Sequence, residues 1–145
     1  MKKLLVLNGI NLNMFGKRDP AQYGTVTLDQ INKEVKALGL ELGFEVECFQ
    51  TNHEGEMVQR IHDAHGDGTK ALLINAGAWT HYSYGIADAL AILEAPVIEV
   101  HMSHVHGREK FRHHSVLSPV VKGVVSGFGP DSYKLALRAA ANLAG

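Results

Sequence analysis

Short apolar runs alternate along the chain with segments in which apolar residues recur every three or four positions. The runs have the length of buried strands, and the second spacing is that of helices with one buried face. Five strands are predicted, at Lys3–Leu7, Phe44–Phe49, Ala71–Asn75, Val97–His101 and Gly123–Ser126. Strands that alternate with helices favour a parallel sheet with helices on both faces.

Four helices are predicted between and after these strands. The first follows Thr27, which forms the sequence of a capping box with Gln30. The others are expected from about Asn52 to the turn at 66–68, across Ile86, Leu90 and Leu93 up to Pro96, and from Pro130 almost to Gly145. This succession predicts a flavodoxin-like, doubly wound α/β fold with a five-stranded parallel sheet in the order 2-1-3-4-5. Its ligand site should lie where the strand order reverses.

Length and composition agree with this fold and exclude some classes of function. A chain of 145 residues favours a single domain spanning 1–145, large enough for its own core. With 14 basic and 15 acidic residues, neither a nucleic-acid partner nor a membrane partner is expected. The one cysteine, Cys48, excludes an intramolecular disulfide and fits a reducing compartment. With no leader sequence or membrane-spanning run evident, we expect a soluble cytoplasmic protein.

Polar side chains gather in the loops after the first, third and fourth strands, which would be neighbours in the sheet. These loops carry Asn11, Asn13, Arg18 and Tyr23, then Asn75 and His81, then His101, Ser103, Arg108 and Arg112. The carboxyl ends of parallel strands are where such sheets bind ligands. Amides, guanidinium groups, a phenol and imidazoles at that edge predict an anionic small molecule and proton chemistry.

Arg18 and Tyr23 form a candidate base in the first of these loops. A free tyrosine has a pKa of about 10 and is a poor base at neutral pH. A nearby guanidinium favours the phenolate and so lowers the pKa of the phenol. A pKa lower by about two or three units would make the phenolate a usable base for a carbon-bound proton. The alternative is an arginine stacked on a tyrosine, in a surface turn rich in Gly and Asn.

Glu99 and His101 form a candidate acid in the fourth strand. Residues two apart in a strand point to the same side, so the two side chains are within reach of each other. A carboxylate that holds one imidazole nitrogen raises the imidazole pKa and fixes its tautomer, which leaves the other nitrogen to donate a proton. The alternative is an ion pair at the strand end.

Further residues are candidates for binding the ligand. The backbone amides of Met102 and Ser103, just past the fourth strand, are placed to cradle a carboxylate. Arg112 is a candidate contact for a hydroxyl or an anionic group. Asn75 and His81 are candidates for hydrogen bonds to hydroxyls, although Asn75 would equally suit a structural turn in which its side chain bonds its own backbone.

The nine histidines raise the question of a metal. His101, His104 and His106 are close in sequence, and His113 and His114 follow. Their spacing fits no metal-binding motif, and there is no His-Glu-x-x-His helix or cysteine pair. Glycine-rich nucleotide-binding motifs and the Gly-x-Ser-x-Gly turn of serine hydrolases are also absent. We therefore expect no metal and no cofactor.

Three blocks of residues stand out at the strand ends. The blocks read Asn8-Gly9-x-Asn11-Leu12-Asn13 with Gly16-x-Arg18-x-Pro20-x-x-Tyr23-Gly24, then Asn75-Ala76-Gly77 with Thr80-His81, then Ile98-Glu99-Val100-His101-x-Ser103 through Arg108-Glu109-x-Phe111-Arg112-x-His114-Ser115. In this order they closely resemble type II 3-dehydroquinate dehydratases. The resemblance extends from the first strand to the final helix.

The resemblance implies a hydro-lyase that removes water from 3-dehydroquinate to give 3-dehydroshikimate, in the shikimate pathway to aromatic amino acids (chorismate biosynthesis). The reaction would be an anti elimination through an enolate, with no metal and no lysine Schiff base. By resemblance, Tyr23 would remove the C2 proton and Arg18 would lower the Tyr23 pKa. Asn11 would stabilise the enolate oxygen through an ordered water. His101, oriented by Glu99, would protonate the departing C1 hydroxyl.

The resemblance also implies binding positions and an assembly. Residues about 16–24 would form a mobile active-site lid. The substrate carboxylate and ring hydroxyls would be bound by Asn75, His81, Met102, Ser103 and Arg112. Asp88, otherwise expected to be a solvated residue of the third helix, would contact the active site of a neighbouring subunit. The family is typically a homododecamer, a tetramer of trimers.

Three positions depart from the family pattern: Ile10 stands where Pro is usual, Ala87 replaces a frequent Arg, and His104 stands where Asn is usual. They bear on lid movement and assembly, and none is a residue assigned to the chemistry. Three alternatives remain open: a metal-dependent hydrolase or lyase that uses the histidines, a non-catalytic binding module, and Schiff-base chemistry through a lysine such as Lys17.

Overall fold

A parallel sheet forms the centre of the computed structural model, which describes residues 1–17 and 19–145 apart from the side chains of Gln22 and Tyr23. Its strands are β1 (Lys2–Asn8), β2 (Phe44–Gln50), β3 (Thr69–Asn75), β4 (Val97–His101) and β5 (Gly123–Ser126). They pair in parallel in the order β2-β1-β3-β4-β5. The predicted strand order is therefore confirmed, and each predicted strand is present.

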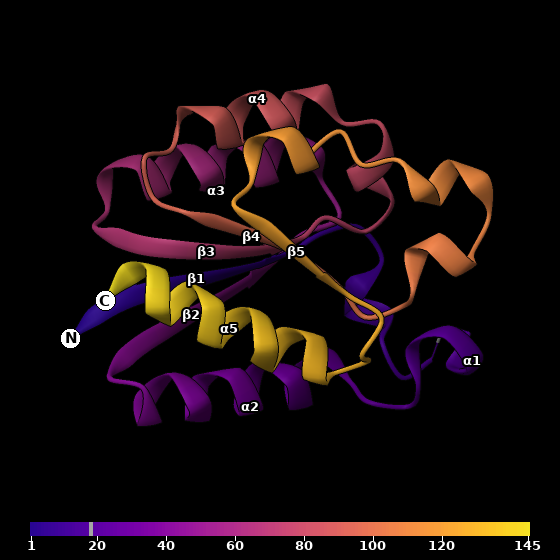
Figure 1. The fold of residues 1–145 in the computed structure, drawn as a ribbon, viewed down its shortest axis with the longest axis horizontal. Helices are drawn as coiled ribbons and strands as arrows, with labels where there is room; N and C mark the ends of the chain where they lie inside the picture. Colours follow the sequence, from indigo (N-terminus) through magenta and orange to yellow (C-terminus); the bar gives the residue numbers. More distant parts are fainter. Residues whose placement is uncertain (18) are drawn as a thin grey trace.

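Four long helices cover the two faces of the sheet. They are α2 (Leu28–Glu41), α3 (Glu54–Gly66), α4 (Tyr84–Ile92) and α5 (Asp131–Ala144). In Figure 1, α3 and α4 lie over one face, and α2 and α5 over the other. Leu4 of β1 packs with the α2 and α5 side, and its neighbour Leu5 packs with the α3 and α4 side. Burial on both faces explains why the strand is a continuous apolar run. No helix in the described residues is long and apolar enough to cross a membrane.

The capping box predicted for the first long helix is present. Thr27 Oγ1 accepts a hydrogen bond from the Gln30 backbone N–H at 3.2 Å, and Gln30 Oε1 accepts one from the Thr27 N–H at 2.8 Å. The start predicted for the second helix was two residues too early, since α3 begins at Glu54. Asn52 stays in the loop, where its Oδ1 accepts a hydrogen bond from the Asn11 backbone N–H at 2.9 Å.

Two other helix ends differ from prediction by one residue. Pro130 caps α5 instead of beginning it, although its φ of −59° and ψ of −27° are already helical. Such differences are ordinary at helix ends. Leu93 lies just outside α4, because its ψ of 137° turns the chain into extended backbone on the way to Pro96.

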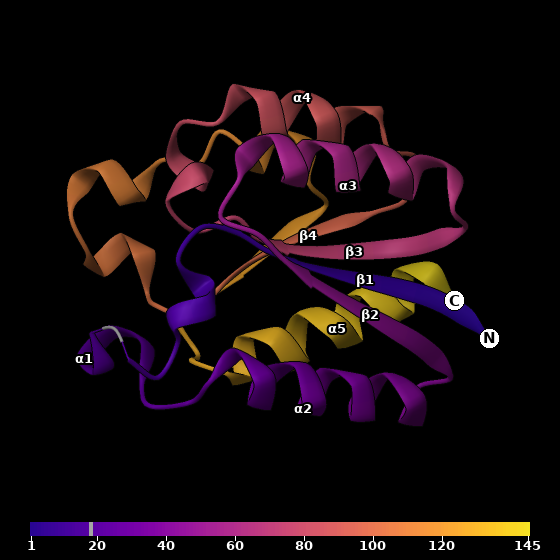
Figure 2. The same ribbon diagram turned by 180° about the vertical axis from the view of Figure 1, so that it is seen from behind.

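Short helical turns were not predicted. They are α1 (Pro20–Tyr23) and the 3₁₀ turns η1 (Leu12–Met14), η2 (Gly77–His81), η3 (Val105–Gly107), η4 (Lys110–His113) and η5 (Ser118–Val120). One turn is too short to produce a recognisable hydrophobic period. Figures 1 and 2 show α1 at the same end of the molecule as the orange segment that contains η3 and η4, beyond the carboxyl ends of the strands.

The loops that leave β1 and β3 pass directly against each other. A Cβ atom on Gly9 would lie 2.5 Å from the carbonyl oxygen of Ala76, and one on Gly77 would lie 2.8 Å from that of Ile10. Gly77 also has a φ of 62°, which favours glycine. Ile10, at the position where proline is usual, is partly buried against the core on the α3 side. The two loops therefore form one continuous floor at the carboxyl edge of the sheet.

Candidate active site

A cavity of about 130 Å³ opens at the carboxyl ends of β1, β3 and β4. The structure brings together six of the predicted site residues in its lining: Asn11, Asn75, His81, His101, Ser103 and Arg112. The remaining lining residues are Ile10, Leu12, Gly77, Ala78, Val105 and Arg108. The three loops that were expected to face one crevice thus do so.

Glu99 and His101 are in direct contact at the end of β4. His101 Nε2 lies 2.6 Å from Glu99 Oε2, and the two residues are only 6% and 1% exposed. An ionised carboxylate can only accept, so Nε2 carries the proton of this hydrogen bond. That arrangement leaves Nδ1 as the nitrogen that can exchange a proton with a ligand.

Two serines hold the other oxygen of the same carboxylate. Ser115 and Ser118 donate from their hydroxyls to Glu99 Oε1 at 2.9 and 3.0 Å. Burial alone would raise the pKa of Glu99, but the hydrogen bond and charge interaction with His101 and the two serine hydroxyls outweigh it. The net result is a pKa below the ordinary value for glutamate, so Glu99 is ionised at neutral pH.

Replacing Ser118 with alanine should lower stability in a pH-dependent way. The carboxylate of Glu99 is stabilised in the folded protein, so this contribution is present above its unfolded pKa of about 4.5 and is lost as the pH falls through its lower folded pKa. At pH 7 the free energy of unfolding should fall by about 1 kcal/mol. Urea unfolding at neutral and acidic pH measures this difference, which should shrink in acid.

Ser118→Thr is the matched control for this prediction because it keeps a hydroxyl at the same position. It should unfold like the unaltered protein at neutral pH. An equal loss of stability by Ser118→Ala at neutral and strongly acidic pH would show that the hydroxyl does not act through the charge of Glu99.

Asn11 is presented to the cavity by an unusual backbone conformation. Its φ of 68° and ψ of 0° lie in the left-handed region, which asparagine adopts more readily than most residues. Its backbone N–H is tied to Asn52 Oδ1, and Asn52 Oδ1 also accepts from Gln50 Nε2 at 3.1 Å. The chain after β1 is therefore anchored to the loop after β2, and Asn11 is among the residues that line the cavity.

Asn75 makes the structural turn that was the alternative to ligand binding. Its Oδ1 accepts a hydrogen bond from the Gly77 N–H at 3.2 Å, two residues along the chain. Its Nδ2 donates to the hydroxyl of Tyr133 at 2.9 Å. Asn75 also lines the cavity, so the structural turn and a contact with a ligand are compatible.

His81 lies across the cavity on η2 and is half-buried. Its Nδ1 donates to the carbonyl oxygen of His114 at 2.8 Å. Burial lowers the pKa of His81, and the nearby His101 and Arg112 lower it further, against the opposing effect of the His114 carbonyl. A neutral ring with its proton on Nδ1 leaves Nε2 as a hydrogen-bond acceptor, which suits a ligand hydroxyl.

Two arginines from the loop after β4 make the cavity cationic. Arg112 donates from Nε to Glu109 Oε2 at 2.9 Å, and its guanidinium group stacks on the ring of Phe111, 4.6 Å from the centroid. Arg108 Nη1 donates to Ser103 Oγ at 3.1 Å. Arg108 was not predicted to bind a ligand, although a second basic residue in the same loop was a signal that could have indicated it.

Two predicted residues are placed differently from the others. Asp88 is exposed on α4 and is not in the cavity lining. The side chain of Met102 is buried in the core, where only its backbone could face a ligand. Of the proposed base pair, Arg18 and the side chain of Tyr23 lie outside the described residues, so that pair and its environment stay a prediction.

The histidines that follow β4 lie close together. The rings of His104 and His106 are 6.4 Å apart between centroids, and those of His106 and His113 are 5.6 Å apart. In the part of the chain that the structure describes, no group of three histidine, cysteine or acidic side chains is placed to hold a metal ion. Of these histidines, His113 donates from Nε2 to the carbonyl oxygen of Arg108 at 2.8 Å.

The fold and the site together define an enzyme of the flavodoxin-like α/β class that acts on a small anionic molecule. A carboxylate-held imidazole, amides and guanidinium groups share one cavity at the carboxyl edge of a doubly wound sheet. The chain belongs to the class II dehydroquinase family, whose model matches residues 2–141.

Individual relatives agree with this assignment. The chain is similar to a 3-dehydroquinate dehydratase of Pelobacter propionicus, with 71% identity over 143 residues, 99% of this chain and 96% of the relative. The crystal structure of the type II dehydroquinase of Propionibacterium acnes has a TM-score of 0.94 and 48% identity, covering 98% of this chain and 97% of its own. That from Butyrivibrio crossotus has a TM-score of 0.94 at 42% identity, with coverage of 96% and 97%.

Proposed function

We propose that this protein dehydrates 3-dehydroquinate to 3-dehydroshikimate in the shikimate pathway. One observation carries the proposal: His101, held by Glu99, lines a cationic cavity in a chain of the class II dehydroquinase family. The substrate has a carboxylate, ring hydroxyls and a ketone, so it needs cationic, donor and acceptor groups. The cavity lining provides all three.

His101 is proposed to act as the general acid. A protonated ring would give its Nδ1 proton to the C1 hydroxyl as the C–O bond breaks, and the hydroxyl would leave as water. Glu99 stays bound to Nε2 throughout and stabilises the charged ring, as the buried aspartate of a catalytic triad does. The two serine hydroxyls on Glu99 keep its charge in place.

Tyr23 is proposed to act as the general base. As a phenolate favoured by Arg18, it would remove a C2 proton, and Asn11 would stabilise the resulting enolate oxygen through a water molecule. Gly16 and Gly24, with φ values of 92° and 71°, stand at the two ends of the segment proposed to be the lid. Both conformations are unfavourable for other residues, and hinges are commonly placed at such positions.

Binding of the substrate is proposed to use the rest of the cavity. The carboxylate would lie on the amides of Met102 and Ser103, near the guanidinium of Arg112. His81 Nε2 would accept a hydrogen bond from a ring hydroxyl, and Asn75 would donate to a substrate oxygen. Each step is a proton transfer or the cleavage of a C–O bond, which these side chains can carry without a cofactor.

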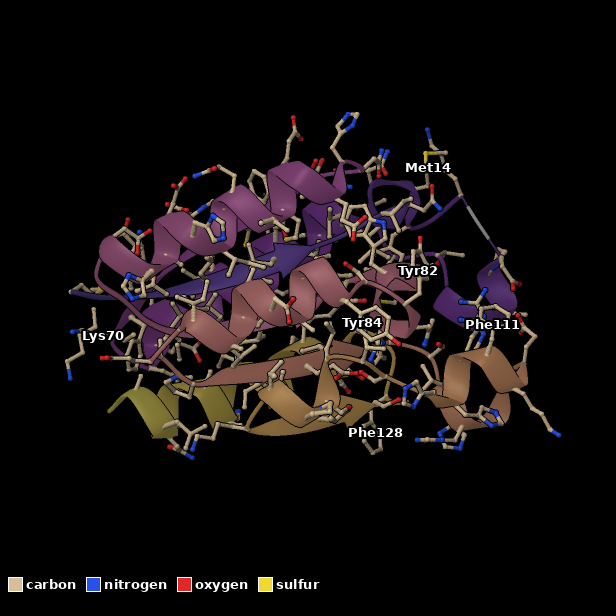
Figure 3. All side chains as sticks on the ribbon, turned by 90° about the horizontal axis from the view of Figure 1, so that it is seen from above. Met14, Lys70, Tyr82, Tyr84, Phe111 and Phe128 are labelled. Atoms are coloured by element: carbon tan, nitrogen blue, oxygen red, sulfur yellow. The ribbon has the colours of Figure 1, made fainter. Side chains whose placement is uncertain are left out.

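We also propose a domain organisation and an oligomeric state for this protein. Residues 1–145 would be one catalytic domain, active in the cytoplasm as a homododecamer. Tyr84 and Asp88 are one helical turn apart on α4 and both are exposed, whereas Ala87 is buried. Figure 3 shows Tyr82 and Phe111, two more exposed aromatic residues, toward the end of the molecule away from Lys70. Such a surface suits contact with a neighbouring subunit, whose cavity Asp88 would reach.

An ultraviolet assay for the conjugated enone of 3-dehydroshikimate tests the proposed function directly. The purified protein should produce this absorbance from 3-dehydroquinate, and the rate should persist after exhaustive chelation. Binding of 3-dehydroquinate without turnover would favour a binding module, and loss of activity on chelation would favour a metal enzyme. Inactivation by borohydride only when substrate is present would indicate a lysine imine, for which Lys17 is a candidate.

A further inference from the structure

A network of buried side-chain hydrogen bonds connects the final helix to the carboxyl ends of β1 and β3, beside the cavity. The Tyr133 hydroxyl of α5 donates to Asn8 Oδ1 at 2.5 Å and accepts from Asn75 Nδ2 at 2.9 Å. Asn8 and Asn75 are register partners at the carboxyl ends of β1 and β3. Tyr133, Asn8 and Asn75 are 0%, 1% and 4% exposed. Polar groups at this depth are costly unless they are hydrogen-bonded, so their arrangement is strongly constrained.

The donor and the acceptor of each hydrogen bond in this buried network follow from one backbone group. The Gly77 N–H can only donate, so the atom of Asn75 that it meets is the carbonyl oxygen. The amide nitrogen of Asn75 must then face Tyr133, whose oxygen accepts. The single proton of the phenol remains for Asn8, which must present its own carbonyl oxygen.

The hydrogen bonds that Asn75 already makes limit what it can offer to a ligand. Its Oδ1 is engaged by Gly77, and one of its two N–H groups is engaged by Tyr133. The second N–H of Nδ2 is the donor that remains, and Asn75 is among the residues that line the cavity. Asn75 would therefore recognise an acceptor oxygen, such as a hydroxyl oxygen or a carboxylate.

We propose that Tyr133 is a positioning residue that fixes Asn75 as a hydrogen-bond donor toward the substrate. This inference rests on the proposed function and adds a residue of the last helix, outside the cavity lining, to the binding site. Burial raises the pKa of Tyr133 far above its usual range, although the Asn75 contact opposes this, so the phenol keeps its proton at any working pH.

The hydrogen bonds of Asn8, the last member of this buried network, also support a fixed donor and acceptor arrangement. In the part of the chain that the structure describes, Asn8 Nδ2 is buried and has no hydrogen-bond partner. Turning the Asn8 amide over would bring Nδ2 to the phenol, but it would set a donor against a hydroxyl that already accepts from Asn75 and must itself donate. Nδ2 of Asn8 therefore stays without a partner in the described residues, and Asn75 continues to donate from Nδ2 to the Tyr133 hydroxyl.

Tyr133→Phe tests the inference because it removes only the hydroxyl. We expect KM for 3-dehydroquinate to rise about five- to tenfold and kcat to change less than about threefold, as expected when a contact made equally in ground and transition states is lost. Ser132→Ala is the matched control: Ser132 is also fully buried at the start of α5, and its hydroxyl oxygen accepts from the Phe128 N–H at 3.0 Å. It should lower Tm without changing KM.

A double-mutant cycle separates positioning from general stability. If Tyr133 acts through Asn75, then Tyr133→Phe should add almost nothing to the KM of Asn75→Ala, although each single change raises it. Equal effects of Tyr133→Phe in both backgrounds, or an unchanged KM in the folded single variant, would overturn the inference. If the unaltered protein binds 3-dehydroquinate without turnover, the proposed function is wrong, and the same comparison made on calorimetric Kd values decides the inference.

One measurement needs no variant, in case Tyr133→Phe fails to fold. In the unaltered protein, NMR should show one Nδ2 proton of Asn75 that exchanges slowly with solvent, since it is held by the buried phenol. Fast exchange of both protons would overturn the inference.

Discussion

Replacing His101 with alanine is expected to lower kcat for 3-dehydroquinate at least about a hundredfold, the low end for general acid catalysis, while KM changes little. The hydroxide that leaves from C1 is a poor leaving group unless it is protonated. His101 is a group of the cavity lining held for that task, through its 2.6 Å contact with Glu99. Steady-state kinetics with the ultraviolet assay measure the effect.

Two further variants make the His101 result specific. Glu99→Gln keeps the shape of the partner but removes its charge, so the imidazolium loses stabilisation and kcat should fall by about tenfold or more. His62→Ala removes an exposed histidine of α3, outside the cavity lining, and should leave both constants unchanged. A His101→Ala protein with more than about a tenth of the original kcat would remove His101 as the acid.

Tyr23→Phe is expected to have an effect of similar size, again at least about a hundredfold in kcat. Phenylalanine fills the same space but has no oxygen to accept the C2 proton. Binding of 3-dehydroquinate, measured by calorimetry, should survive because the carboxylate and hydroxyl contacts lie elsewhere in the cavity. The large loss in kcat with retained Kd is the signature of a base that acts in the transition state.

The exposed Tyr82 provides the control for the base. Tyr82→Phe removes a phenol that follows η2 at the surface, and it should leave kcat unchanged. Near-normal turnover by Tyr23→Phe would overturn the assignment. In that case the proton would have to be taken by another group, and the lysine alternative would regain weight if borohydride also inactivated the protein.

The sheet was predictable because each strand carries a strong local signal. Burial on both faces makes β1 and β3 continuous apolar runs, and helical spacing with a capping box at Thr27 marks α2. The one-turn elements at the carboxyl edge were not predictable, because three to five residues show no period. The start of α3 was placed too early because the tie between Asn52 and Asn11 joins segments far apart in sequence.

The residues of the site, too, fall into those that the sequence could predict and those that it could not. Glu99 and His101 could be paired from strand alternation alone, and the loops after β1, β3 and β4 could be brought together from the strand order. The residues that support them could not be found. Ser118 and Tyr133 reach Glu99 and Asn75 from 19 and 58 residues away along the chain. Contacts of that kind depend on tertiary packing, which local patterns do not encode.

The stereochemistry of water loss tests the central claim most directly. Two samples of 3-dehydroquinate, each with deuterium at one of the two C2 positions, are converted to product and analysed by mass spectrometry. A base on the lid acting opposite the acid His101 predicts loss of deuterium only from the sample that carries it on the face opposite the C1 hydroxyl. Loss of deuterium from the same face as the hydroxyl would contradict the account.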